Sequence, residues 1–583
     1  MGCQKLAPFN YQSVMALLSQ IKASFRLNIT GTSRLNQLTA SFAVLLLLIS
    51  LPKLTLGKPL VRVNLIGYLN GDSKIAVVAS SVPLTGQAFL IVEHGRIVYR
   101  GYLSADRGIY QAHAHNYLAD FSALKGDGLY RLVLDSTESD DFEIGRDVYH
   151  SLPDSLLRFF AVQRCGKNTP LLHSPCHLSD VSKVVNGDTS MSPVDLTGGW
   201  HDAGDYLKFS ITTAYSSYLL LLTYQEFPSL FNKWLSFKQA APVVEAKIGL
   251  EWLIKTHLDS SRLISQVQNL NDHGVGWRLP ENDPLATKRT GYAYGSKATA
   301  GSTAAALALG SVVFKKLGDE EFGRKCLTHA IDIFDMAMAG RLPERDARPD
   351  SHYFDSDSRD NIALAAVELY RATKVERYLT IAKQLSDTLG AGGWISWGDL
   401  QGIVAFRLAE YHPIARDYLE WALISYQEAS LRNPYAYPFQ NYPWGSLSLQ
   451  TGVGILVAGY ELAGGSDQFR ALATRQRDAI FGVNPFGISY LANVGDRSTR
   501  FFHHQVSHLK NVTLPGGLAE GAIARKEFDD SGIRLERADS LIHFQSDLGV
   551  YHDDRMDFLT NEPTIGNNAQ AIFLLGWFAN MGR

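Results

Sequence analysis

Cysteine is scarce in this chain of 583 residues, which contains only four: Cys3, Cys165, Cys176 and Cys326. A framework of disulfides therefore cannot hold the fold together, and a hydrophobic interior must do so. An excess of one charge is also missing, because the formal net charge at pH 7 is only −3. Such a surface lacks the basic excess that binds polyanions, so we expect no nucleic-acid partner.

Long apolar runs are lacking apart from residues 42–51, close to the N-terminus. Arg26 and Arg34 precede this run and Thr55-Leu56-Gly57 follows it, an order that resembles a signal peptide. The run has roughly half of the ~20 residues that a membrane-spanning helix needs, which makes an uncleaved anchor the alternative. We therefore expect residues 1–57 to be a leader, the protein to be exported (secreted or periplasmic), and no further membrane partner.

Short β-like segments fill the region from residue 58 to residue 148. Apolar and β-branched residues cluster at 74–78, 88–92 and 128–134, with turn formers between the segments. Several short strands within one stretch of this length predict a small β-sandwich of the immunoglobulin-like type.

From residue 149 to residue 583 the apolar period lengthens to about 3.6 residues, which predicts helices. Twelve helical stretches begin near residues 155, 211, 241, 303, 322, 361, 378, 398, 415, 447, 468 and 567. Twelve helices make six hairpins, and segments such as 303–317 are apolar on more than one face, like the inner helices of a closed ring. We expect a mainly α fold, an (α/α)6 barrel of six hairpins, with long polar loops building a functional face.

The first chemically informative cluster is the loop 198–206, Gly-Gly-Trp-His-Asp-Ala-Gly-Asp-Tyr. Asp202 and Asp205 are separated only by small residues, so both carboxylates can point at one water molecule and one of them can take its proton. A turn that caps the following helix, or a calcium loop, are the alternatives for the same spacing.

The second cluster is the acid-rich run 551–562 just before the last helix. We expect its aspartates and partial burial to raise the pKa of Glu562 and keep it protonated for donation to a leaving oxygen. Arg555 offers the alternative of a salt-bridged loop. The crowding aspartates are Asp553, Asp554 and Asp557.

A carboxylate that holds water and a second one that stays protonated are the two groups that an inverting glycosidase requires. The C-terminal cluster also matches a known signature in register, through Tyr551, Asp553, Phe558, Glu562, Thr564, Asn568 and Ala569. On these residues the chain resembles glycoside hydrolase family nine, the cellulases whose six-hairpin barrel often follows an immunoglobulin-like domain. The resemblance extends from Val61 to the C-terminus.

The resemblance implies an endo-acting enzyme that cleaves β-1,4-linked glucan poly- or oligosaccharides by inversion. In it Asp205 is similar to the general base and Asp202 to its helper, while Glu562 is similar to the general acid and Asp553 to its companion. An exo-acting glucosidase or glucosaminidase that works on oligosaccharide ends is the alternative among enzymes. A non-catalytic carbohydrate-binding protein is the alternative from another class.

A third motif departs from the family pattern. The family usually ends it His-His-Arg, whereas this chain has His503, His504 and Gln505. The resemblance makes His503 a sugar contact, and the missing guanidinium leaves the preference of the neighbouring subsite open. We also expect substrate contacts from Tyr206 and from loop aromatics. The candidate loop aromatics are Trp277, Tyr292, Trp394, Trp397 and Trp444.

Cys165 and Cys176 permit either a local disulfide or a metal site, because His177 follows directly. The resemblance favours a structural zinc held by these three residues and His201, a closed tetrahedral site that would steady the loop of Asp202. The resemblance also admits calcium, for which the sequence reveals no ligands. A monomer is the default expectation.

Overall fold

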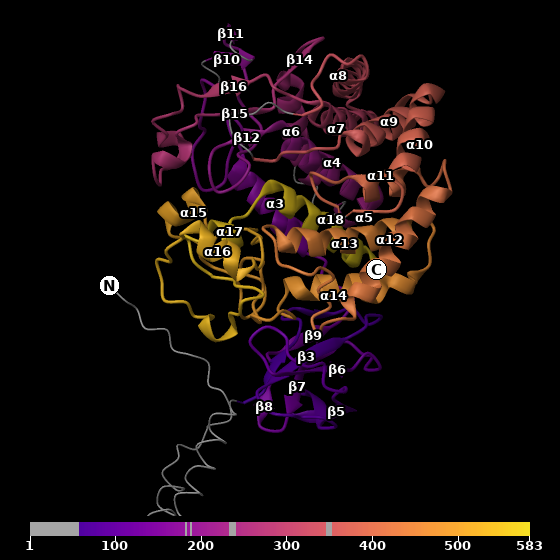
Figure 1. The fold of residues 1–583 in the computed structure, drawn as a ribbon, viewed down its shortest axis with the longest axis vertical. Coiled ribbons are helices and arrows are strands. Elements are labelled where there is room, and N and C mark those ends of the chain that lie inside the picture. Colours follow the sequence, from indigo (N-terminus) through magenta and orange to yellow (C-terminus); the bar gives the residue numbers. More distant parts are fainter. Residues whose placement is uncertain are drawn as a thin grey trace, which may run out of the picture. The chain divides into compact units, whose positions relative to one another are not determined.

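The computed structural model describes residues 58–180, 183–186, 189–231, 241–345, 352–393 and 395–582 (Figure 1). The chain divides into two units, residues 1–57 and residues 58–583. The predicted leader and Trp394 lie outside the described residues, and everything below concerns the second unit.

Two β-sheets form the N-terminal part of this unit. Strand β3 (Ile75–Ser80) pairs antiparallel with β6 (His115–Asp120) in the first sheet, with Val77 opposite Leu118. Residues of both sheets, such as Val78 of the first and Phe89 of the second, share one hydrophobic core, as expected for two sheets packed face to face. The first sheet has the order β1 (Leu60–Arg62), β3 (Ile75–Ser80), β6 (His115–Asp120). The second has the order β2 (Gly67–Tyr68), β9 (Phe142–Ile144), β7 (Gly128–Leu134), β4 (Ala88–Glu93), β5 (Arg96–Tyr102), with β8 (Thr137–Glu138) paired to β7.

Each of the twelve predicted helical stretches coincides with a helix of eight residues or more. Four shorter helices were not predicted: α5 (Pro228–Phe231), α15 (Gln505–Lys510), α16 (Arg525–Ser531) and α17 (Phe558–Asn561). The longer helices are α3 (Leu152–Gln163), α4 (Ser210–Glu226), α6 (Ala241–Thr256), α7 (Lys297–Lys316), α8 (Glu320–Met338), α9 (Arg359–Thr373), α10 (Glu376–Leu389), α11 (Gln401–Leu408), α12 (Ile414–Ser430), α13 (Ser446–Leu462), α14 (Arg470–Ile480) and α18 (Ile565–Met581).

Six of these helices are buried on nearly all sides, and each contacts the next so that the contacts form a closed cycle. Helix α4 packs on α7, α7 on α9, α9 on α11, α11 on α13, α13 on α18, and α18 on α4. Every residue of α18 from Ile565 to Ala579 is buried. Small residues permit the close packing, since a Cβ at Gly301 of α7 would lie 2.5 Å from the backbone of Asn361 in α9.

Helix α7 is long and apolar enough to cross a bilayer, and it alone among the described helices. Because 89% of its apolar stretch is buried inside the protein, it has the character of a core helix.

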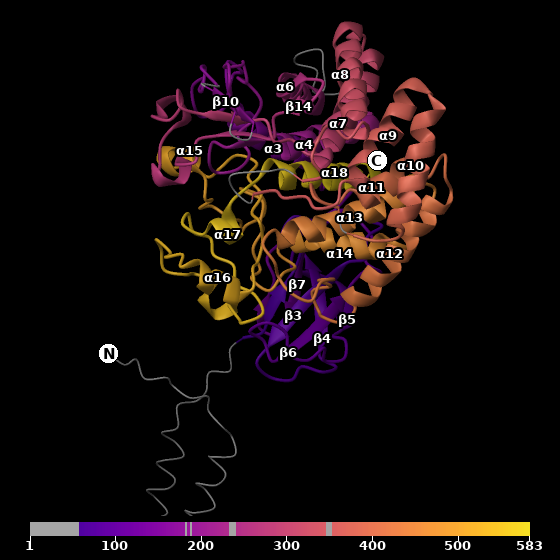
Figure 2. The same cartoon turned by 45° about the horizontal axis from the view of Figure 1, so that its top comes forward.

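A small sheet brings two of the long loops together. Strand β12 (Lys208–Phe209) pairs antiparallel with β15 (Gln266–Gln268), so the segment before residue 208 lies beside the segment after residue 268. Figure 1 and Figure 2 both show β10 (Lys183–Asn186), α15, α16 and α17 along one side of the helices. The rest of this sheet is β16 (Thr290–Tyr292), β10 (Lys183–Asn186) and β11 (Thr189–Met191), and a separate hairpin joins β13 (His257–Asp259) to β14 (Arg262–Leu263).

The β-sandwich is joined to the helices by a buried polar network, which we call the junction network. The Arg477 guanidinium on α14 lies 2.8 Å from the carboxylate of Asp72 and 2.7 Å from that of Asp478. The Asn64 side-chain amide donates to Asp478 Oδ1 and to the Tyr149 hydroxyl, each over 2.8 Å. The network therefore ties loops of the β-sandwich to α14 without any exposed charge.

Candidate active site

The two carboxylates predicted to carry the chemistry are brought together by Gly204. Its backbone N–H donates to Glu562 Oε1 over 2.9 Å, and Asp205 is the next residue. A Cβ at Gly204 would lie 2.2 Å from the carbonyl oxygen of His503, so only glycine permits this approach. Two segments that are far apart in the sequence thus meet at one point.

Asp205 is held as a carboxylate. Its Oδ1 accepts a hydrogen bond from the N–H of Leu207 over 3.0 Å. Its Oδ2 lies 3.0 Å from His273 Nε2. Burial alone would raise the pKa of Asp205, but the hydrogen bond and charge of His273 together with the Leu207 N–H bring it below its usual value. The side chain remains 18% exposed, so a water molecule can reach it.

The surroundings of Glu562 favour its neutral, protonated form. Burial raises its pKa well above the usual value, and the negative charge of Asp205 raises it further, while the N–H of Gly204 acts in the opposite direction. The charges of Glu520 and Asp202 add to the upward shift. A lowered pKa on Asp205 and a raised pKa on Glu562 are the states suited to a base and an acid.

The expected direction of that shift was right, and burial, one of its two expected causes, is the largest cause. The other expected cause was wrong, because the charges that add to the shift come from Asp205, Glu520 and Asp202 and not from the neighbouring aspartates. The aspartates next to Glu562 in sequence are occupied by backbone N–H groups instead. Asp553 accepts from Arg500 and Phe501, and Asp554 from Glu536 and Arg537. Asp557 caps helix α17 and also binds His552 and Thr560.

Asp202 is buried and oriented by two hydroxyl groups. Thr212 donates to its Oδ1 and Tyr353 donates to its Oδ2. Tyr353, Glu520 and His273 were missed in the sequence because each comes from a loop distant from Asp202 and Asp205. His273 had a weak signal, since it follows an aspartate within one of the long loops predicted to build the functional face.

His503 is placed beside the two carboxylates with one ring nitrogen committed. Its Nδ1 lies 2.6 Å from the carbonyl oxygen of Arg555, so Nδ1 carries the hydrogen. Burial lowers the pKa of His503, which leaves a neutral ring whose Nε2 is an acceptor. His504 points the other way, into the protein, and donates to Gln163 Oε1 over 2.7 Å.

Gln505 and Tyr206, two predicted sugar contacts, point inward instead. Gln505 is only 7% exposed, and its Oε1 accepts from the backbone N–H of Arg278 over 3.0 Å. Tyr206 is 2% exposed, and its hydroxyl donates to the carbonyl oxygen of Arg278. Both side chains therefore support the segment around Arg278, a tertiary contact that the sequence did not reveal.

The predicted aromatic contacts divide into exposed and packed rings. Trp444 is 49% exposed and lies 5.8 Å from the Phe558 ring. Trp277 lies between His503 and His508, with its ring stacked 4.4 Å from the latter. Trp397 is partly buried against Tyr353, and Tyr292 is buried.

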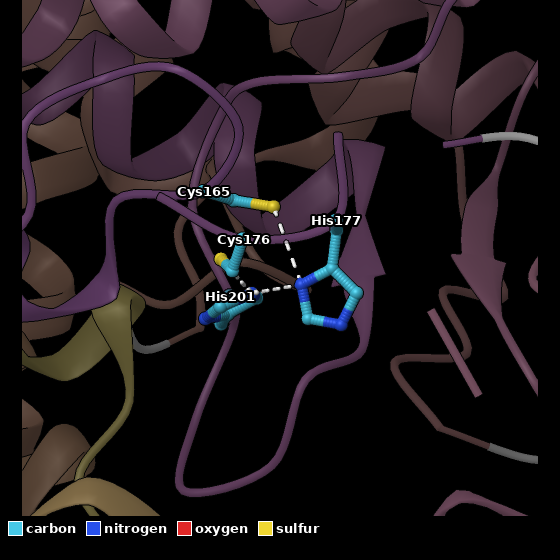
Figure 3. Close-up of side chains that lie close together, drawn as sticks. All are labelled: Cys165, Cys176, His177 and His201. Carbon is cyan, nitrogen blue, oxygen red and sulfur yellow. Dashed lines mark hydrogen bonds between the residues drawn. The ribbon is translucent and has the colours of Figure 1, made fainter. Parts of the chain in front are cut away.

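Cys165, Cys176, His177 and His201 form a buried cluster whose four ligand atoms all lie within 4.8 Å of one another (Figure 3). Both cysteines are free thiols, so the disulfide alternative is not realised. His177 Nδ1 is 3.8 Å from Cys165 Sγ and 3.3 Å from His201 Nε2, and Cys176 Sγ is 3.8 Å from that same nitrogen. These side chains could hold a metal ion.

Calcium ligands are less defined. Among the described residues, the cysteine–histidine cluster is the one compact group of metal-binding side chains. Calcium therefore stays a prediction without assigned ligands.

Comparison with known proteins gives a consistent result. Residues 149–575 match the family model described as "Glycosyl hydrolase family 9", and residues 57–139 match "Cellulase N-terminal ig-like domain". A cellodextrinase of Butyrivibrio fibrisolvens is 25% identical over 559 residues, which cover 88% of this chain and 98% of that protein. Endoglucanase 14 of Arabidopsis thaliana is 26% identical over 470 residues, covering 74% of this chain and 93% of that protein.

Solved structures agree with the family match. A metagenome-derived family 9 endoglucanase superimposes with a TM-score of 0.77 at 24% identity, covering 90% of this chain and 99% of its own. A zinc-binding triple mutant of another family 9 endoglucanase gives a TM-score of 0.76 at 25% identity, with coverage of 88% and 99%.

Proposed function

The chain belongs to glycosyl hydrolase family 9 and is a glycoside hydrolase of the cellulase type, and within that frame we propose an inverting β-1,4-glucanase. Asp205 is the general base and Glu562 the general acid. The observation that carries this assignment is the opposite shift of their two pKa values at a point where Gly204 joins them. An inverting reaction needs about 6.5–9.5 Å between the carboxyl groups, enough room for the attacking water.

The proposed reaction assigns one role to each group. The Asp205 carboxylate takes a proton from water as the water attacks the anomeric carbon, and Glu562 donates its proton to the departing glycosidic oxygen. Asp202, oriented by Thr212 and Tyr353, helps to hold the water. Asp553 acts as companion by fixing the backbone of residues 500–501, which leads to the sugar contact His503. Trp444 offers an exposed ring for stacking on sugar.

The architecture proposed for the helical part is the (α/α)6 barrel. The cycle of contacts among six buried helices, from α4 through α18 and back to α4, supports a closed inner ring. The remaining six long helices pack on that ring from outside, α8 for example on α7 and α9. We keep residues 58–148 as the immunoglobulin-like domain and 149–583 as the catalytic domain.

The metal proposed for the cysteine–histidine cluster is a structural zinc. With Zn–N distances of about 2.0–2.1 Å and Zn–S distances of about 2.3 Å, tetrahedral geometry separates two nitrogens by about 3.3 Å and a nitrogen from a sulfur by about 3.6 Å. The separations of 3.3 Å and 3.8 Å between the ligand atoms fit this geometry. Four protein ligands close the site, so the ion supplies rigidity to the loop that continues from His201 to Asp205.

An exo-acting enzyme on oligosaccharide ends is the second candidate. The cellodextrinase of Butyrivibrio fibrisolvens, which this chain matches over 98% of that protein's length, favours keeping it. Export, by way of the predicted leader, and a monomeric state also belong to the proposal.

Product analysis tests the proposed function. We expect the purified protein to release a range of cello-oligosaccharides from cellulose and from cellohexaose, and Glu562→Gln to release none although it keeps the wild-type melting temperature. Stepwise release of single units from one end of the chain would favour the exo alternative. Release from chitosan oligomers alone would favour a glucosaminidase, and glycan binding without any cleavage would favour a binding protein.

A further inference from the structure

We propose that Asp283 is a positioning residue that connects the cysteine–histidine metal site to the general base through Arg278 and the turn that carries His273. The inference rests on the proposed roles of Asp205 and of the metal site. This path through side chains is separate from the loop of residues 201–205, which also connects the metal site to Asp205. We call these side chains, from His177 through Asp283, Arg278 and Asp272 to His273, the positioning network.

The first link joins Asp283 to the metal site. His177 uses Nδ1 toward Cys165 and His201, and its Nε2 lies 3.0 Å from Asp283 Oδ2. Both side chains are essentially inaccessible, at 0% and 1% exposed. A metal on Nδ1 requires the hydrogen to sit on Nε2, so the carboxylate fixes both the tautomer and the orientation of the ring.

The second link joins Asp283 to Arg278. Asp283 Oδ1 lies 2.7 Å from Arg278 Nε and also accepts from the N–H of Leu285. Both oxygens of Asp283 are therefore engaged, Oδ2 with His177 and Oδ1 with Arg278.

The third link joins Arg278 to the turn Asp272–Gly274. One terminal nitrogen of Arg278 pairs with the Asp272 carboxylate, and the other donates to the carbonyl oxygens of Asp272 and Gly276 over 3.2 Å. A planar guanidinium with several donors in fixed directions can clamp such a turn, which a single ammonium cannot.

The last link is His273 itself. Its Nε2 contacts Asp205 Oδ2 over 3.0 Å, while 62% of its side chain is exposed. A ring so exposed depends for its placement on the backbone from which it projects, and Arg278 clamps that backbone. A change at Asp283 should therefore reach Asp205, although Asp283 is buried and its hydrogen bonds go to His177 and Arg278.

A second buried ion pair provides a control that separates loss of positioning from loss of a buried charge. Glu368 and Arg407 form a buried ion pair at 2.6 Å, with side chains 0% and 2% exposed. Their partners Tyr218 and Glu226 both lie on α4, and none of these residues belongs to the metal site. Glu368→Gln is thus a control for loss of a buried carboxylate.

The test compares Asp283→Asn, Arg278→Lys and Glu368→Gln with the wild type. Three quantities are measured: Zn²⁺ affinity by competition with a chromophoric chelator, kcat and KM on cellohexaose, and the melting temperature. We expect Asp283→Asn to lose about 10- to 100-fold in Zn²⁺ affinity. Its kcat should fall about 10-fold because charge-assisted hydrogen bonds are lost, while KM stays near the wild-type value.

The other two variants distinguish effects at the metal end of the positioning network from effects at its Asp205 end. Arg278→Lys leaves the bond between Asp283 and His177 intact, so we expect near wild-type Zn²⁺ affinity with kcat lowered about 10-fold. Glu368→Gln should lower the melting temperature alone.

Wild-type Zn²⁺ affinity and kcat in Asp283→Asn, accompanied only by a lower melting temperature, would overturn the proposal. If Asp283→Asn does not fold, Arg278→Lys decides, because an unchanged kcat in that variant overturns it as well. The proposed function fails separately, through full activity of Asp205→Asn, and the Zn²⁺ affinities do not depend on that result.

Discussion

Two buried charged networks in this protein use the same residue types for different ends. In the junction network, Arg477 lies between the carboxylates of Asp72 and Asp478. In the positioning network, Arg278 lies between those of Asp272 and Asp283. The first closes on buried partners, whereas the second leads to an exposed histidine and a partly exposed aspartate. Burial of charge thus serves cohesion in one place and placement of reactive groups in the other.

The largest contrast comes from the same substitution in each region. Asp205→Asn removes the proposed base, and we expect kcat to fall by about 10²–10⁴-fold while the melting temperature stays near the wild-type value. Asp478→Asn should do the reverse, lowering stability while kcat per folded molecule is kept. Initial rates on cellohexaose measure kcat, and thermal melts measure the stability of each variant. An Asp205→Asn variant with near wild-type kcat would show that the base lies elsewhere.

The junction network is broken most directly by Arg477→Met. This change leaves two buried carboxylates without their cation, so we expect the free energy of unfolding to drop by about 3–5 kcal/mol in urea denaturation. Arg497→Met is the matched control, because its pair with Asp140 is 45% and 25% exposed. Its loss should be below about 1 kcal/mol. Equal losses in the two variants would contradict the role given to burial.

Gln505→Arg tests whether the side chain of Gln505 holds the backbone of Arg278 in place. The substitution removes the acceptor of the Arg278 N–H, a bond worth about 0.5–1.5 kcal/mol, so we expect kcat to fall by roughly 2- to 10-fold. Steady-state kinetics on cellohexaose measure it, with Gln468→Arg on the surface as control. A lower KM with unchanged kcat would mean that position 505 faces the sugar after all.

The smallest expected effect is on pH dependence. Catalysis requires protonated Glu562, so activity is lost as pH rises through its raised pKa. Burial raises the pKa of Glu520 to about 7, so its charge develops above that pH and holds the pKa of Glu562 up. Glu520→Gln removes this charge and should move the alkaline limb of the kcat profile to lower pH by less than about one unit. A shift upward, or an equal shift in Glu368→Gln, would contradict this coupling.

Much of the fold could be predicted because its signals are local. The change of apolar period at residue 149 located twelve helices, and the apolar faces of residues 303–317 predicted the burial of α7 on nearly all sides. The four short helices escaped because they arise from loop closure: α17, for example, depends on capping by Asp557 rather than on an apolar stripe.

The candidate site was predictable where a motif or the resemblance pointed to a residue. The resemblance pointed to Asp205 and Glu562, and the structure brings them to one glycine. The partners that set their pKa values, His273 and Glu520, come from remote loops and follow from tertiary contact alone. Gln505 and Tyr206 were assigned to sugar because a sequence does not tell which way a loop side chain turns.

The central claim is that Asp205 and Glu562 act on opposite sides of a glycosidic bond with water between them. Proton NMR of wild-type enzyme on cellohexaose measures it directly, through the anomeric signal of the newly formed reducing end in the first minutes, before mutarotation. We predict that the α-anomer appears first and the β-anomer grows in later. Initial appearance of the β-anomer would mean retention and would contradict the assignment.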